Sequence, residues 1–120
     1  MKTDNKILDL SFDFSLSIIK LYKSLVENKE YVLSKQVLRS GTSIGANIEE
    51  AIAAQTKKEF ITKMSIASKE VRETRYWLRL LDKRRLIVLD YSPYLISIND
   101  IINILTKIVK TSQESMLHAK

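Results

Sequence analysis

The chain has 120 residues, of which 45% are apolar and one is proline, a composition that predicts one folded domain over residues 1–120 rather than a disordered segment. It carries a net charge of +6 and no cysteine, and the missing cysteine excludes disulfides, thiolate metal sites and thiol catalysis. No apolar run approaches the roughly 20 residues of a membrane span, and Asp4 and Asp9 interrupt the place of a signal-peptide core, so we expect a cytoplasmic protein.

Apolar residues recur at helical spacing through the first half of the chain. Ile7, Phe14, Ile18, Leu21 and Leu25 follow this spacing and predict a first helix from about residue 5 to about residue 27. A polar break at residues 28–30 follows, and the spacing then resumes from residue 33 to about residue 55.

Both glycines of the chain, Gly41 and Gly45, lie inside this second predicted helix. Their spacing fits neither a P-loop nor a dinucleotide-binding turn. Because a glycine inside a helix costs about 0.5–1 kcal/mol relative to alanine, the pair indicates a close helix–helix or subunit contact, with a bend or break near Gly41 as the alternative. Small and polar residues line the neighbouring face of the helix. A bundle should not need such a face for its own core, so we expect a homo-oligomer.

Two boundary signals define the second half of the chain. Residues 56–59, Thr-Lys-Lys-Glu, form a capping box that predicts a helix start, and the apolar seam after it ends near Arg84. Ser92 as the cap and Pro93 as the first helical residue predict the start of a fourth helix. Four helices with short connections predict an all-α fold, an antiparallel up-down-up-down four-helix bundle.

The excess positive charge is confined to the third predicted helix and the residues just after it. Residues 57–85 hold ten basic and four acidic side chains, whereas the rest of the chain is balanced. Projection at about 100° per residue places a row of these side chains on one face, which we call the basic ridge. Its members are Lys69, Arg72, Arg75, Tyr76, Arg79 and Lys83. Such a row can bind phosphates and stack a base on Tyr76, although an outward helix face is often only a solvated surface.

A polar group lies on another side of the same helix. Glu70, Glu73 and Trp77 fall between the basic ridge and the apolar seam, and we expect a polar network or oligomer contact that also includes Ser40, Asn47 and Glu50. The network would fix helix or subunit register, with an uncharacterised site as the alternative. The Glu-x-x-His pattern of di-iron bundles is absent, so we expect no metal, no cofactor and no catalytic residue.

Two strings carry a family resemblance, SKQVLRSGTSIGANIEEA and ASKEVRETRYWLRLL. They resemble the bacterial four-helix-bundle proteins encoded in intervening sequences of large-subunit (23S) ribosomal RNA genes, over about residues 8–110. The resemblance implies an antiparallel bundle that assembles into ring-shaped homopentamers, and a related bundle serves as an accessory factor in retroelement reverse transcription. No enzymatic activity comes with it.

Together these features predict a non-catalytic, homo-oligomeric protein that binds nucleic acid through the basic ridge. RNA is preferred to DNA because of the resemblance alone. The alternative is an oligomeric interaction scaffold whose basic ridge docks an acidic protein partner, and salt-dependent RNA binding separates the two.

Overall fold

The computed structural model describes residues 2–85 and 87–118, which form four α-helices and no strand. The helices are α1 (Lys2–Glu27), α2 (Leu33–Ile52), α3 (Lys57–Arg84) and α4 (Ser92–His118). The all-α prediction is therefore confirmed for this part of the chain. Boundaries differ slightly from those predicted, since α1 begins before residue 5 and α2 ends before residue 55.

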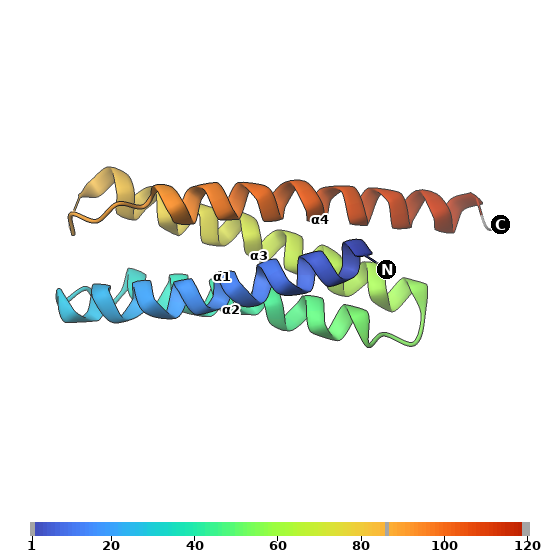
Figure 1. Cartoon of the computed structure of the whole chain (residues 1–120), viewed down its shortest axis with the longest axis horizontal. Helices are drawn as coiled ribbons and strands as arrows, with labels where there is room; N and C mark the ends of the chain where they lie inside the picture. The colour runs from blue at the N-terminus through green and yellow to red at the C-terminus, as the bar shows by residue number, and fades with distance from the viewer. Residues whose placement is uncertain (1, 86, 119–120) are drawn as a thin grey trace.

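The four helices lie along a body about 53 Å long and 22 Å across (Figure 1). α1 and α3 each contact both α2 and α4. Arg39 bonds to Glu73, whereas Glu50, later in α2, bonds to Lys63, earlier in α3. α2 and α3 thus run in opposite directions, and the whole arrangement is compatible with the predicted up-down-up-down bundle.

One apolar core runs along the bundle and receives side chains from every helix. Most of the residues whose spacing predicted the helices are buried or half-buried there; Ile52, at the end of α2, is 39% exposed. The fully buried large side chains are Ile7, Ile18, Leu21, Leu25, Ile44, Ile48, Met64, Leu78, Leu81, Ile98, Ile101 and Leu105. Because each helix buries one stripe, its remaining faces are available to solvent or to partners.

The two glycines lie where α2 packs against α1 of the same chain. A β-carbon at Gly41 would lie 2.9 Å from Cγ2 of Ile18, and one at Gly45 would lie 3.3 Å from Oγ of Ser15. The close helix–helix contact is therefore internal, and the alternative of a helix break near Gly41 is wrong, since α2 is uninterrupted. Ser40 is also buried within the chain, against α3. The bundle thus uses much of this face for its own packing, contrary to our expectation.

Side-chain carboxylates and a hydroxyl satisfy the free amides at three helix starts. Thr56 Oγ1 accepts the N–H of Glu59 (3.0 Å), which confirms the predicted cap of α3. The carboxylate of Glu30 accepts three N–H groups at the start of α2, those of residues 32–34. α4 begins at Ser92, so Ser92 is helical rather than the predicted cap. Its N–H donates to Asp90 Oδ1 (3.0 Å), and this bond lowers the pKa of Asp90.

Candidate nucleic-acid interface

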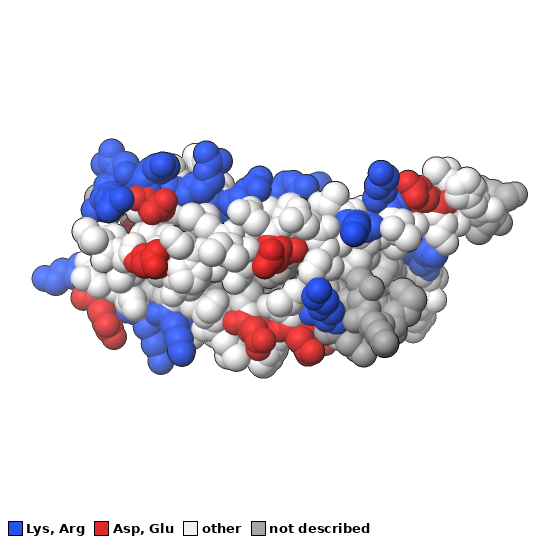
Figure 2. All heavy atoms as spheres, turned by 45° about the horizontal axis from the view of Figure 1, so that its top comes forward, with Lys and Arg blue, Asp and Glu red and all other residues white. Residues whose placement is uncertain are grey.

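The basic ridge lies along the outward side of α3. The opposite side of this helix packs in the core, where Val71, Thr74 and Leu78 are buried. The helical repeat therefore places the ridge on the outside. Lys69, Arg72, Tyr76, Arg79 and Lys83 are exposed, whereas Arg75 is half-buried. Figure 2 shows blue lysine and arginine atoms along the upper edge of the molecule, most densely at the left-hand end, where α3 ends in Figure 1.

Neutral oxygen atoms hold two guanidinium groups of the ridge. Nη1 of Arg75 donates to Oδ1 of Asn99 on α4 (3.4 Å). Nη1 of Arg72 donates to the carbonyl oxygen of Ser68, one turn earlier in α3 (3.0 Å). Both contacts position the guanidinium group and leave its positive charge uncompensated.

The charges of the ridge have no direct carboxylate partner within the described chain. The salt bridges found in residues 2–85 and 87–118 join Arg39 to Glu70 and Glu73, and Lys63 to Glu50. None of them includes a ridge residue. The ridge therefore presents several full positive charges to solvent, and such a surface attracts polyanions.

An aromatic ring stands among these charges. Tyr76 is 55% exposed and lies between Arg72 and Arg79 along the ridge. Its ring meets that of Trp77 edge-on, with 5.2 Å between the centroids and 67° between the planes. Edge-to-face contact is a favoured aromatic geometry, and Trp77 in turn packs against the core.

A second cluster borders the ridge on the side of α2, and we call it the Arg39 clasp: Arg39, Glu70, Glu73 and Trp77. The guanidinium of Arg39 contacts Glu70 (3.5 Å) and donates to Oε2 of Glu73. The same Oε2 accepts the indole N–H of Trp77 (3.0 Å). The side chains are 50% exposed for Arg39 and 36% for Glu73, so solvent screens the pair and its contribution to stability is small, about 0–1 kcal/mol.

The other polar residues that we expected in this network lie elsewhere. Asn47 donates to the carbonyl oxygen of Ser43 within α2 (2.9 Å), and Glu50 pairs with Lys63 (3.2 Å). A single network joining Asn47, Glu50 and Glu73 is therefore wrong. The reason is the opposite direction of α2 and α3, which places Glu50 about 15 Å along the bundle from the clasp. Ser40 instead forms a buried hydroxyl pair with Thr74 (2.8 Å).

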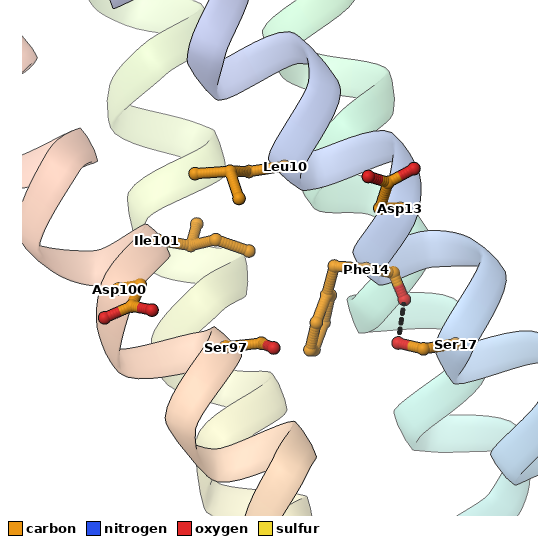
Figure 3. Close-up of a pocket in the computed structure, with 7 residues that line it drawn as sticks. All are labelled: Leu10, Asp13, Phe14, Ser17, Ser97, Asp100 and Ile101. Carbon is orange, nitrogen blue, oxygen red and sulfur yellow. Dashed lines mark hydrogen bonds between the residues drawn. The ribbon is translucent and has the colours of Figure 1, made fainter.

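A small cavity opens between α1 and α4, away from the ridge (Figure 3). It measures about 170 Å³ and is lined by Leu10, Asp13, Phe14, Ser17, Ser97, Asp100 and Ile101. The hydroxyl of Ser17 donates to the carbonyl oxygen of Phe14 (2.7 Å), as the dashed line shows. No basic side chain lines the cavity, which makes it a poor site for a phosphate and leaves the ridge as the candidate interface.

Two further features concern the part of the chain that the structure describes, residues 2–85 and 87–118. No three histidine, aspartate or glutamate side chains among them lie close enough to hold a metal ion. None of the helices formed by these residues is long and apolar enough to cross a membrane.

The family of the chain follows from comparison with known proteins. The family model of the 23S rRNA-intervening sequence protein matches residues 3–108. The chain belongs to this family. A crystal structure at 1.70 Å resolution of a protein of unknown function from the S23 ribosomal protein family of Bacteroides thetaiotaomicron is 48% identical. The match covers 90% of this chain and 98% of that one, with a TM-score of 0.86. A search of curated proteins gives no match.

In this 23S rRNA-intervening sequence protein, sequence reasoning missed Arg39 as a partner of the predicted carboxylates. Glu70 and Glu73 lie one turn apart on α3 and face α2, where Lys35 and Arg39 are the basic residues. A cation on α2 could therefore have been sought from the sequence. Whether Lys35 or Arg39 contacts the two carboxylates depends on how far α2 is shifted along α3, which helical spacing alone does not determine.

Proposed function

We propose that the protein is a non-catalytic, homo-oligomeric RNA-binding or ribonucleoprotein-accessory protein that acts through the basic ridge. One observation carries the proposal: the ridge cations lack direct carboxylate partners in the described chain, while the neighbouring Glu70 and Glu73 are occupied by Arg39. A surface that only needed to be soluble would not require this separation of charge. A polyanion gains from it, because each phosphate contact releases a counterion.

The chemistry of the ridge favours a nucleic acid over an acidic protein. Arg72 and Arg79 present guanidinium groups, which match phosphate geometry and keep their charge at any physiological pH. The exposed ring of Tyr76 between them offers a surface on which a base can stack. RNA is preferred over DNA because the family is named after intervening sequences in ribosomal RNA.

We further propose that the protein assembles as a homo-oligomer, with a pentamer as the expected state. The internal packing of Gly41 and Gly45 removes one argument for it. A remaining argument in favour of an oligomer comes from α1, where Phe12, Leu16 and Ile19 are 61%, 50% and 40% exposed. Their spacing puts them on one side of the helix, a pattern typical of a helix–helix contact with a second copy. Light scattering at micromolar concentration should give five copies of the 13.9 kDa chain, about 70 kDa. A monodisperse monomer would contradict the proposed oligomer.

A matched pair of charge-reversal variants tests the binding function. One variant carries Arg72→Glu, Arg75→Glu and Arg79→Glu in the ridge, and the control carries Lys20→Glu, Lys23→Glu and Lys35→Glu on exposed positions of α1 and α2. Both variants change the net charge equally. We expect the ridge variant to lose RNA binding and the control to lose only a small part of it, because contact charges act at short range while distant charges are screened.

Two outcomes of this comparison reject the RNA proposal. One is the absence of measurable affinity of the wild-type protein for RNA at low salt. The other is equal loss of affinity in the two variants, which would mean that only net charge matters. The first result makes a scaffold that docks an acidic protein through the ridge the better account, and the second removes the specific role of the ridge in RNA binding.

A further inference from the structure

Tyr76 stands at the end of a chain of contacts that begins on α2. Arg39 donates to Oε2 of Glu73, and the same oxygen accepts the indole N–H of Trp77 at 3.0 Å. The Trp77 ring then meets the Tyr76 ring edge-on at 5.2 Å. Three side chains from two helices therefore form a continuous set of contacts that ends at one exposed ring.

The two aromatic rings differ in burial. Trp77 is half-buried and packs against the core, whereas Tyr76 is 55% exposed. Because Tyr76 is 55% exposed despite its contact with Trp77, much of its surface remains accessible to a ligand. The Trp77 ring is thus anchored by packing and by its hydrogen bond, and the Tyr76 ring contacts this anchored ring edge-on.

We infer that the Arg39 clasp is a positioning device that holds the Tyr76 ring in place for stacking on an unpaired base of single-stranded RNA. The inference rests on the proposed RNA-binding function and adds the chemical feature that the ridge recognises. A ring fixed before binding loses less rotational freedom when a base stacks on it, and a preorganised side chain therefore binds more tightly than a free one.

Charge gives the clasp a second effect, which the experiment must separate from positioning. Arg39 compensates Glu70 and Glu73, which would otherwise repel phosphates beside the ridge. Arg39→Gln makes the site more negative and Glu73→Leu makes it more positive. A purely electrostatic role predicts opposite changes in RNA affinity for the two variants, whereas a positioning role predicts loss of the Tyr76 contribution in both.

The test is a set of double-mutant cycles with a fluorescein-labelled oligoadenylate as the probe. In each background, wild type, Arg39→Gln and Glu73→Leu, the Kd is measured with and without Tyr76→Ala. In wild type we expect Tyr76→Ala to weaken binding by about five-fold or more, as for a stacked base. In both clasp variants we expect the same substitution to weaken binding by less than about two-fold.

The Trp77→Phe variant keeps every charge and serves as the alternative if a clasp variant does not fold. Circular dichroism checks the helix content of each protein, and Trp77, as the only tryptophan, reports its surroundings by its emission. If a clasp variant does not fold, Trp77→Phe replaces it, because this change removes the indole N–H, keeps an aromatic ring and every charge, and should also reduce the effect of Tyr76→Ala. An equal effect of Tyr76→Ala in every background would overturn the inference while leaving RNA binding intact. Absence of RNA binding by the wild type would overturn both.

Discussion

Gly41 of α2 lies against Ile18 of α1 so closely that a β-carbon at position 41 would come within 2.9 Å of Cγ2 and 3.0 Å of Cγ1 of that isoleucine. Both atoms belong to a branched, fully buried side chain. Ile18 therefore cannot move away from one contact without pressing on the core. The separation of α1 and α2 at this point depends on the absence of a side chain at position 41.

Gly41→Ala should destabilise the bundle even though alanine favours helix. Overpacking of a tight core costs about 1–3 kcal/mol, and the gain in helix propensity of about 0.5–1 kcal/mol offsets part of it. Gly45→Ala is the matched control, because its nearest neighbour, Oγ of Ser15, would lie 3.3 Å from the new β-carbon, further away than Ile18 is at position 41. Urea unfolding should show a lower midpoint for Gly41→Ala and little change for Gly45→Ala. Equal midpoints for the two variants would disprove the steric explanation.

The buried hydroxyl pair of Ser40 and Thr74 should matter more for stability than the exposed ion pair of the clasp. Thr74→Val preserves shape but leaves the Ser40 hydroxyl without its partner across the helices, at a cost of about 1–3 kcal/mol. Glu73→Gln should change the free energy of unfolding by about 1 kcal/mol or less, because solvent reaches both partners. We would compare the two by urea unfolding.

A double variant provides the internal check for this pair. Adding Ser40→Ala to Thr74→Val removes both polar groups and should recover part of the lost stability, since the unpaired hydroxyl is then gone. No recovery in the double variant would show that packing at position 74, rather than the hydrogen bond, determines the loss.

Helical spacing predicted the helices and most of the core because burial repeats with the helix itself. Ile7, Ile18 and Leu25 are all buried where their spacing placed them. The start of α2 at Leu33 also agrees with the spacing, whereas its cap was not predicted, because the Glu30 side chain reaches forward over several residues to form it. The sequence also did not predict which helix packs against Gly41, since a helix face without side chains can contact either the same chain or another subunit.

The candidate site was predictable only in part, because helical spacing determines positions on one helix but not contacts between helices. The exposed side chains of Arg72, Tyr76 and Arg79 follow from their positions on one helix. The contact of Arg39 with Glu73 depends on the relative shift of two helices, which many small packing choices set together. Pairs within one helix can thus be predicted from the sequence, and pairs between helices require the structure.

The pKa shift of Tyr91 predicts a loss of stability at high pH. Burial raises the pKa of Tyr91 above its ordinary value of 10.0, and the negative charges of Asp82 and Glu30 raise it further. The neutral form is thus favoured in the folded state, and the stabilisation is complete below pH 10 and declines as the pH rises through the higher folded pKa. Urea unfolding of the wild type at pH 8 and at pH 11 should show this decline.

Tyr91→Phe and Tyr31→Phe serve as the pair of controls. Tyr91→Phe loses the hydrogen bond to the carbonyl oxygen of Ile87 (3.3 Å), so it should be less stable at pH 8 but also less sensitive to alkali. Tyr31 is 53% exposed, and Tyr31→Phe should keep the wild-type response. The same alkaline decline in all three proteins would assign it to another group.

The central claim, that the basic ridge binds RNA through phosphate contacts, is tested most directly by the salt dependence of the affinity. Fluorescence anisotropy with a labelled single-stranded RNA gives the Kd at several salt concentrations, for the wild type and for the triple variant Arg72→Gln, Arg75→Gln and Arg79→Gln. Each lost phosphate contact reduces the slope of log affinity against log salt by about 0.7, so the triple variant should have a slope smaller by about 2. Wild-type binding without salt dependence, or an unchanged slope in the triple variant, would contradict the account.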